Sequence, residues 1–248
     1  MRPVLIFTHF DDRRTGLVGD ALELAGCSMV QANPADGIPA WSIDEISAIV
    51  SFGGRFNAQD ADRDPFLAAE VALMREALAR ETPVLGFCLG AQLLAVASGG
   101  EVWRLGRMLV GWPRLSPLPA AREDPLFGAL RGGLHVLEWH QDAIAAGSGA
   151  VLLATTSGPG DALYRVGPSA WGSQAHIEVS QSMLLDGWLA DKSGVADVEA
   201  MAFEIDAFRD EAREHLAVQT EAARAVFERF GQLVSARERL LGPAQAAY

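Results

Sequence analysis

The chain has 248 residues, half of them apolar, and a formal net charge of −12. This length suffices for one large α/β domain, or for a smaller domain with an appendage. The acidic balance, 32 acidic against 20 basic residues, provides no positive surface for nucleic acid or for an anionic membrane. We therefore expect neither nucleic acid nor a membrane among the partners.

Only two cysteines occur, Cys27 and Cys88, which are too few for a disulfide framework and form no CxxC pair for zinc or redox chemistry. This usage favours a reducing, cytoplasmic setting. The N-terminal segment contains an apolar run of four residues, far shorter than the hydrophobic part of a signal peptide or a membrane span. We expect neither an export signal nor a transmembrane segment.

The first part of the chain alternates short apolar runs with longer amphipathic stretches, which is typical of parallel strands joined by crossover helices. We expect strands at 4–9, 27–32, 48–52 and 83–87, and helices at 16–25 and 66–80. The pattern predicts an α/β fold with a doubly wound, mostly parallel sheet flanked by helices.

From residue 104 to 156 the pattern changes to short segments separated by prolines and glycines, which predicts a small antiparallel β portion of the same domain. A turn at 157–161 follows. The stretch 162–179 is then expected to be extended.

Beyond residue 194 the pattern is helical and predicts a C-terminal extension of one or two helices. We divide the chain into a catalytic domain, residues 1–192, and this helical extension, residues 193–248. The extension is either a packing or homodimer element or a lid over the substrate. Its last part, 242–245, is expected to be mobile.

The most informative stretch runs from Gly86 through Cys88 to Gly90 and joins an apolar strand directly to good helix formers. This is the pattern of a nucleophile elbow. Cys88 would begin a helix, where unpaired N–H groups favour the thiolate, and the N–H of Leu89 could bind an oxyanion. A buried structural role is the commoner one for cysteine, and Cys27 keeps that interpretation.

Two further motifs complete the set. Gly54 follows the third expected strand, so its N–H is either a second oxyanion donor or part of an ordinary turn. His176 and Glu178 lie two residues apart near the end of the extended stretch, where a strand would point both to one site. A thiol nucleophile needs a base, and the base needs an acceptor that fixes its tautomer. Alone, such a His-x-Glu pair would usually be surface decoration.

Together these motifs resemble the class I glutamine amidotransferases, particularly stand-alone members similar to the glutaminase domain of GMP synthase. The family motif Gly-x-Cys-x-Gly-x-Gln is matched from Gly86 to Gln92, and its His-x-Glu pair by His176 and Glu178. The resemblance covers roughly residues 4–190 and implies the flavodoxin-like amidotransferase fold.

The resemblance also implies roles for single residues. Cys88 would be the nucleophile, His176 and Glu178 its catalytic partners, and the N–H groups of Gly54 and Leu89 the oxyanion hole. The backbone around Trp139 and His140, with the Gln92 side chain, would hold the α-carboxylate and α-amino groups of a glutamyl substrate; His140 is otherwise a packing residue.

The chain departs from the family at three positions. Ala175 and Ile177 replace a phenylalanine and a proline around His176, and Arg55 replaces a proline after the paired glycines. No catalytic group is lost. The pocket is expected to differ, so the substrate need not be plain glutamine.

The implied reaction is hydrolysis of a γ-glutamyl amide, without a metal or organic cofactor. The chain has no Gly-x-x-x-x-Gly-Lys-Ser/Thr loop for ATP. It is therefore either a free-standing hydrolase of a γ-glutamylated amine, which we favour slightly, or a glutaminase that supplies ammonia to a synthase partner. Two other hypotheses are a regulatory module that has lost turnover, and an amidase or protease indifferent to the γ-glutamyl group.

Overall fold

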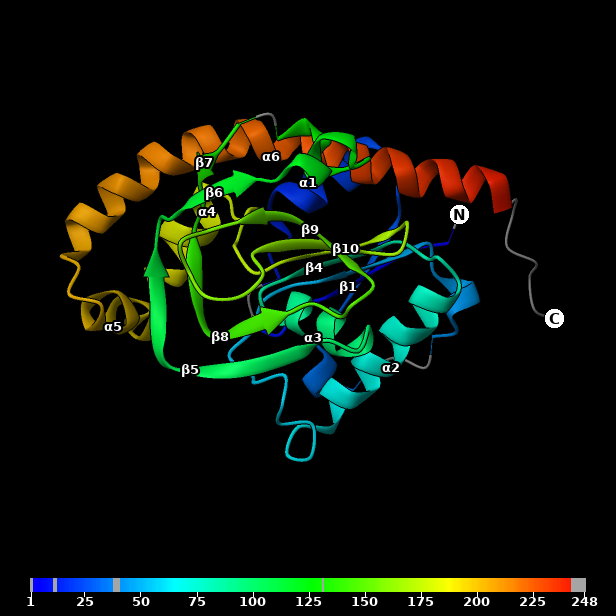
Figure 1. Cartoon of the computed structure of the whole chain (residues 1–248), viewed down its shortest axis with the longest axis horizontal. Coiled ribbons are helices and arrows are strands. Elements are labelled where there is room, and N and C mark those ends of the chain that lie inside the picture. The colour runs from blue at the N-terminus through cyan, green and yellow to red at the C-terminus, as the bar shows by residue number, and fades with distance from the viewer. Residues whose placement is uncertain (1, 11–12, 38–40, 131, 242–248) are drawn as a thin grey trace.

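The computed structural model describes residues 2–10, 13–37, 41–130 and 132–241 (Figure 1). Within these residues the centre is a mixed sheet of nine strands in the order β2-β1-β3-β4-β11-β10-β9-β6-β7. The strands are β1 (Val4–Phe7), β2 (Met29–Ala32), β3 (Ala48–Ser51), β4 (Val84–Phe87), β6 (Arg114–Pro117), β7 (Leu134–His135), β9 (Ala150–Thr155), β10 (Leu163–Val166) and β11 (Ala170–Ser173).

The first five strands in that order run parallel, and each of the other four is antiparallel to its neighbour. Every residue of β1, β3 and β4 is buried. Strands that are covered on both faces have no polar side, and their sequences are therefore continuous apolar runs. The predicted parallel part of the sheet is confirmed.

Helices cover both faces of the sheet (Figure 1). The helices α1 (Gly16–Leu24) and α6 (Ile205–Leu241) belong to one apolar cluster, and α2 (Pro65–Ala79) and α3 (Leu89–Ala97) to a second one. The α/β class with flanking helices is therefore confirmed. None of the helices within the described residues is long and apolar enough to cross a membrane.

A second, two-stranded antiparallel sheet pairs β5 (Glu101–Gly111) with β8 (Glu138–Ala145). Short 3-10 helices connect the remaining parts at Pro34–Asp36, Ile43–Glu45, Pro119–Glu123 and Phe127–Ala129. The small antiparallel β portion is present as predicted.

The C-terminal part is helical, as predicted. It comprises α4 (Gln181–Met183), a π-helical turn η5 (Leu184–Trp188), α5 (Lys192–Ala200) and the long α6. A close approach fixes α6 on α1, because a methyl group on Gly231 would lie only 2.8 Å from the Ala25 Cβ and 3.0 Å from the Ala21 carbonyl oxygen. The stretch 242–245 lies outside the described residues.

The prediction of one extended stretch over 162–179 is wrong. The chain forms the antiparallel pair β10 and β11, whose second strand ends at Ser173, and then turns. His176 makes an isolated bridge to Leu137, with its N–H donating to the Leu137 carbonyl at 2.8 Å. His176 and Glu178 therefore lie in a turn, and their side chains are not oriented by the alternation of a strand.

Candidate active site

Cys88 lies in the sharp turn between β4 and α3, with φ +49° and ψ −106°, a conformation that L-residues rarely adopt. The flanking glycines make this turn feasible. A methyl group on Gly86 would lie 2.6 Å from the Gly90 backbone, and one on Gly90 would lie 2.1 Å from the Ser51 carbonyl oxygen. This strand-turn-helix geometry is that of a nucleophile elbow.

His176 and Glu178 form a buried pair, with His176 Nδ1 2.8 Å from Glu178 Oε1. Burial lowers the pKa of His176, but the Glu178 carboxylate and the Cys88 sulfur beside it raise this pKa from 6.5 to about 10. The imidazole is therefore held in its protonated form at neutral pH. A protonated imidazole stabilises negative charge on a neighbouring sulfur.

The nucleophile and the imidazole converge at Gly53. A methyl group on Gly53 would lie 3.0 Å from His176 Cε1 and 3.8 Å from Cys88 Sγ. The thiol is also 3.8 Å from the Trp139 carbonyl oxygen. Cys88 is thus in contact with the backbone of β8 and interacts with the His176 imidazole.

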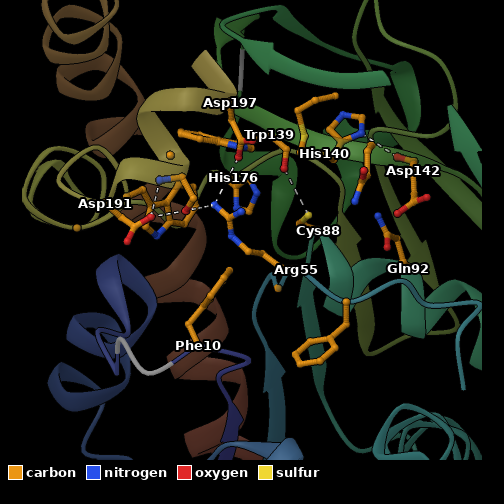
Figure 2. A pocket seen from close by; sticks show the side chains of 18 of the residues that line it. Phe10, Arg55, Cys88, Gln92, Trp139, His140, Asp142, His176, Asp191 and Asp197 are labelled. Carbon is orange, nitrogen blue, oxygen red and sulfur yellow. Dashed lines mark hydrogen bonds and ion pairs between the residues drawn. The ribbon is translucent and has the colours of Figure 1, made fainter. Parts of the chain in front are cut away.

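These groups open into a cavity of about 740 Å³ (Figure 2). Gln92, His140 and Asp142 lie on one side of Cys88, while Asp191 and Asp197 lie on the other. The cavity therefore extends from the nucleophile in two directions. One side is built by α3 and β8, and the other by α5 and the residues just before it.

The side that contains Gln92 is lined by buried polar groups. The Gln92 amide donates to Gln174 Oε1 at 3.2 Å, and His140 Nδ1 donates to the Asp142 carbonyl oxygen at 2.8 Å. Among the described residues, His140 Nε2 has no hydrogen-bond partner. Burial raises the pKa of Asp142, and Arg104 and His140 partly offset this.

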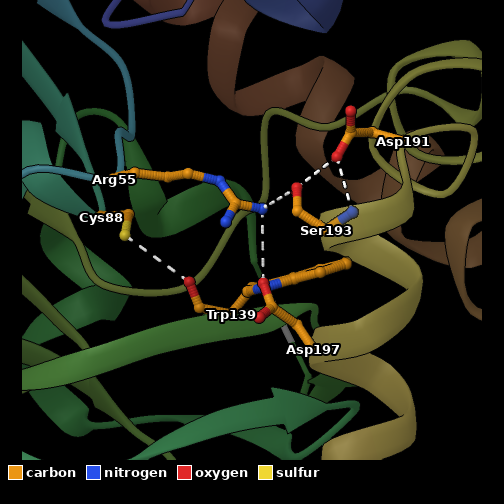
Figure 3. Close-up of polar contacts among 6 residues, drawn as sticks. All are labelled: Arg55, Cys88, Trp139, Asp191, Ser193 and Asp197. Atoms are coloured by element: carbon orange, nitrogen blue, oxygen red, sulfur yellow. Dashed lines mark hydrogen bonds and ion pairs between the residues drawn. The ribbon is translucent and has the colours of Figure 1, made fainter.

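The opposite side comes from residues after the sheet. The Trp188 indole lies edge-on to the His176 imidazole, with ring centroids 4.9 Å apart and planes at 79°. Trp139 Nε1 donates to Asp197 at 3.1 Å, and the Arg55 guanidinium donates to Ser193 at 2.7 Å (Figure 3). Arg55 also lies 3.5 Å from Asp197. The loop after Gly54 and the strand β8 are thus both bound to α5.

The helix α6 reaches the catalytic turn from behind. The Gln219 side chain is fully buried, donates to the His176 carbonyl at 2.9 Å and accepts from the Leu137 N–H at 3.3 Å. A hydrogen bond between backbone groups, from the Leu17 N–H to the Glu178 carbonyl at 3.2 Å, also holds this turn. The turn that carries His176 and Glu178 is therefore held by contacts with α1 and α6.

Comparison with known proteins agrees with this geometry. The Peptidase C26 family matches residues 53–109. The glutamine amidotransferase-like protein YfeJ of Salmonella typhimurium is 26% identical over 65% of this chain and 74% of its own length. The GMP synthase of Bacteroides fragilis is 28% identical over 80% of this chain, which spans only 37% of that enzyme.

A crystal structure of a glutamine amidotransferase from Thermotoga maritima superposes with a TM-score of 0.81 and 25% identity, covering 93% of this chain and 98% of that one. The chain is therefore similar to class I glutamine amidotransferases in both sequence and fold. The resemblance inferred from the elbow and the His-x-Glu pair is thereby confirmed. The match at 53–109 begins at the paired glycines and contains the elbow.

The residues that the resemblance predicted for the site lie together in the structure. Cys88, Gln92, Trp139, His140, His176 and Gly54 all line the cavity. Glu178 lies behind His176, and Leu89 is the first residue of α3. Their roles in binding and chemistry stay predictions.

Several cavity residues were missed from the sequence. Trp188, Asp197 and Phe10 line the cavity but carry no local motif that points there. Asp142 had a signal, because it belongs to the same Trp-His-Gln-Asp stretch as Trp139 and His140.

Proposed function

We propose that this protein hydrolyses a γ-glutamyl amide through a γ-glutamyl thioester on Cys88. The observation that carries the proposal is the convergence of Cys88, at a strained elbow, with the buried His176–Glu178 pair. A nucleophile, a proton carrier and an acceptor that orients it are the parts that acyl transfer to a thiol requires. The similarity to the Peptidase C26 family and to a glutamine amidotransferase-like protein supports amide hydrolysis of this type.

In the proposed reaction, the Cys88 thiolate attacks the γ-carbonyl carbon and a C–S bond forms. The N–H groups of Leu89 and Gly54 hold the oxyanion. The C–N bond breaks as His176 gives its proton to the leaving amine. Water then loses a proton to His176 and attacks the thioester. The C–S bond breaks, glutamate leaves, and the thiolate is restored.

The glutamyl group is proposed to lie on the side of the cavity that contains Gln92. There the Gln92 side chain and the backbone at Trp139 and His140 would hold the α-carboxylate and α-amino groups. The leaving amine would then lie on the side of Trp188 and Asp197. This assignment places the scissile bond beside Cys88, between the two sides.

The cavity size favours a γ-glutamylated amine over glutamine. Cavities of roughly 300–1,000 Å³ hold drug-sized ligands, and this one measures about 740 Å³. Glutamine would fill only part of it and would release ammonia, which needs no apolar wall. Trp188 and Phe10 provide such a wall for a larger amine. We therefore favour a free-standing hydrolase.

A second candidate is a glutaminase that supplies ammonia to a synthase partner. It is favoured by the similarity to GMP synthase of Bacteroides fragilis, which is glutamine-hydrolysing by name. The chain spans only 37% of that enzyme, so the group that consumes the ammonia would lie outside the matched part. The third candidate, a regulatory module without turnover, has no comparable support because Cys88, His176 and Glu178 are all present.

The thiols of Cys27 and Cys88 are both free, which fits the proposed cytoplasmic setting.

The test is glutamate release from L-glutamine, from γ-glutamyl anilides and from γ-glutamyl alkylamides. The wild-type protein is compared with Cys88→Ala and with the matched control Cys27→Ala, which removes the other thiol. We expect turnover in wild type and in Cys27→Ala and none in Cys88→Ala.

The substrate profile separates the candidates. Faster turnover of substituted amides than of glutamine supports the free-standing hydrolase. Turnover of glutamine alone, or only after addition of a synthase, favours the ammonia-supplying subunit. If neither substrate class is turned over, with or without a synthase, the hydrolase proposal is wrong.

A further inference from the structure

Glu70 is a fully buried carboxylate that the proposed mechanism does not use. It lies on α2, a helix whose other acidic residue, Glu76, is exposed. A buried charge is costly unless it is paired and hydrogen-bonded. The surroundings of Glu70 should therefore contain groups that compensate for this cost.

Two buried side chains do so. Glu70 Oε2 lies 2.9 Å from His9 Nε2, and Glu70 Oε1 accepts from the Ser51 hydroxyl at 2.6 Å. The side chains of His9 and Glu70 are both 0% exposed. Because one carboxylate binds both partners, it fixes the ends of β1 and β3 relative to each other.

Each partner of Glu70 touches one of the two proposed oxyanion segments. A methyl group on Gly54 would lie 2.6 Å from His9 Cβ, so the Gly54 backbone rests on the His9 side chain. A methyl group on Gly90 would lie 2.5 Å from Ser51 Oγ, so the first turn of α3 rests on Ser51. The turn that carries the Leu89 N–H and the loop that carries the Gly54 N–H therefore both lie against the Glu70 network.

We propose that Glu70 is a positioning residue, which acts through His9 and Ser51 to hold the N–H groups of Gly54 and Leu89 at the spacing an oxyanion requires. The inference rests on the proposed function in that these two N–H groups are taken as the oxyanion donors. An oxyanion hole works because its donors are already in place before charge develops. The contacts of Glu70 with His9 and Ser51 would hold both N–H groups in place before the substrate reacts.

Glutamine cannot replace this carboxylate fully. Among the described residues, His9 Nδ1 has no hydrogen-bond partner. With the Nε2–H tautomer, both His9 and Ser51 donate to Glu70, and a carboxylate accepts from two donors with two oxygens. The amide of Gln has only one accepting oxygen, so Ser51 or His9 would have to change from donor to acceptor, and both contacts would lose the negative charge of the carboxylate although the size is kept. Glu70→Gln should therefore loosen one donor segment.

The experiment compares two reactions of the Cys88 thiol in the full-length protein. Acylation by p-nitrophenyl acetate forms a C–S bond through a tetrahedral oxyanion and then expels p-nitrophenolate. Alkylation by iodoacetamide displaces iodide from carbon and forms no oxyanion. Both rates are measured in wild type, Glu70→Gln, Ser51→Ala and the exposed control Glu76→Gln, with Cys88→Ala as the background. Thermal unfolding shows whether each variant is folded. If Glu70→Gln is unfolded, the comparison is made with Ser51→Ala.

We expect Glu70→Gln and Ser51→Ala to lower the acylation rate about 10-fold or more, with alkylation within about twofold of wild type and no change in Glu76→Gln. Equal losses in both reactions, or no loss in acylation, would overturn the proposal, as would a wild-type protein that is not acylated at Cys88. Neither reagent carries a γ-glutamyl group. Failure of the proposed substrate class would instead appear as an absence of γ-glutamyl hydrolysis with acylation intact.

Discussion

The side chain of Gln219 on α6 donates to the carbonyl of His176 at 2.9 Å. This contact joins the C-terminal helix to the residue proposed to carry protons in the reaction. Trp188 on the imidazole and Asp197 on Trp139 are two further contacts from the C-terminal part. The helices after the sheet therefore help to build the site as well as covering it.

Gln219→Ala should reduce both stability and activity. It leaves the buried His176 carbonyl and Leu137 N–H without their partner, which costs about 1–3 kcal/mol. The turn that carries His176 would also be less well fixed, and a small displacement can lower turnover by about 10-fold or more. Urea unfolding and γ-glutamyl hydrolysis measure the two effects. Gln232→Ala, an exposed position on the same helix, is the control. Equal behaviour of the two variants would contradict this account.

The raised pKa of His176 predicts a pH dependence of stability. Because the folded-state pKa of about 10 lies above the ordinary value of 6.5, protonated His176 stabilises the fold fully below about pH 6.5. This contribution is lost as the pH rises toward 10. The free energy of unfolding should therefore fall more steeply between pH 6.5 and 9 in wild type than in His176→Gln.

Glu178→Gln provides a second comparison for the same measurement. The Glu178 carboxylate raises the pKa of His176, so in this variant the loss of stability should still begin near pH 6.5 but should be smaller and end at a lower pH. Parallel unfolding curves for wild type, His176→Gln and Glu178→Gln across this range would show that His176 is not paired as described.

Gly53→Ala should impair catalysis more than folding. The added methyl group would lie 3.0 Å from His176 Cε1 and 3.3 Å from Cys88 Cβ, pushing the two catalytic groups apart. The neighbours must move by a few tenths of an ångström, and because a misplacement of about 1 Å can lower turnover by about 100-fold, we expect kcat to fall by about 10-fold. Gly149→Ala is the matched control, because a methyl group there meets open space. Steady-state kinetics measures the loss of kcat, and thermal unfolding measures the effect on the fold. A Gly53→Ala protein as active as wild type would contradict the described geometry.

Trp188→Ala should change substrate preference. If the indole binds the leaving amine, its loss should lower kcat/KM for a γ-glutamyl anilide relative to glutamine by about 10-fold or more. Trp103→Ala, an exposed tryptophan outside the cavity, should leave the ratio unchanged. An equal loss of kcat/KM on both substrates would mean that Trp188 only positions His176 and does not bind the leaving amine.

The elbow and the parallel strands could be predicted because their signals are local. Gly86 and Gly90 are required by contacts within a few residues of Cys88 and with the adjoining strand. The buried strand Val84–Phe87 has no polar face to obscure its pattern. A short stretch of sequence therefore contains most of the information for this part of the site.

The orientation of His176 and Glu178 was predicted for the wrong reason. A strand was expected, but β11 ends at Ser173 and a turn brings the two side chains together at 2.8 Å. The pairing with Leu137 and the support from Gln219 come from distant parts of the chain. Local alternation does not contain these contacts.

The remaining parts of the site depend on tertiary packing. Trp188 on η5 and Asp197 on α5 reach the cavity through tertiary packing, with Asp197 accepting a hydrogen bond from Trp139 on β8, and no spacing rule indicates this. Glu70 is one of several charged residues in its helix, and its burial depends on His9 and Ser51 from other strands. These residues need the structure to be found.

The most direct test of the central claim is mass spectrometry of the Cys88 peptide after acid quenching during turnover of a γ-glutamyl anilide. The account predicts a γ-glutamyl group on Cys88 that hydroxylamine removes, with no such group on Cys27 or in Cys88→Ala. Glutamate release by wild type without any adduct on Cys88, or turnover retained in Cys88→Ala, would contradict it.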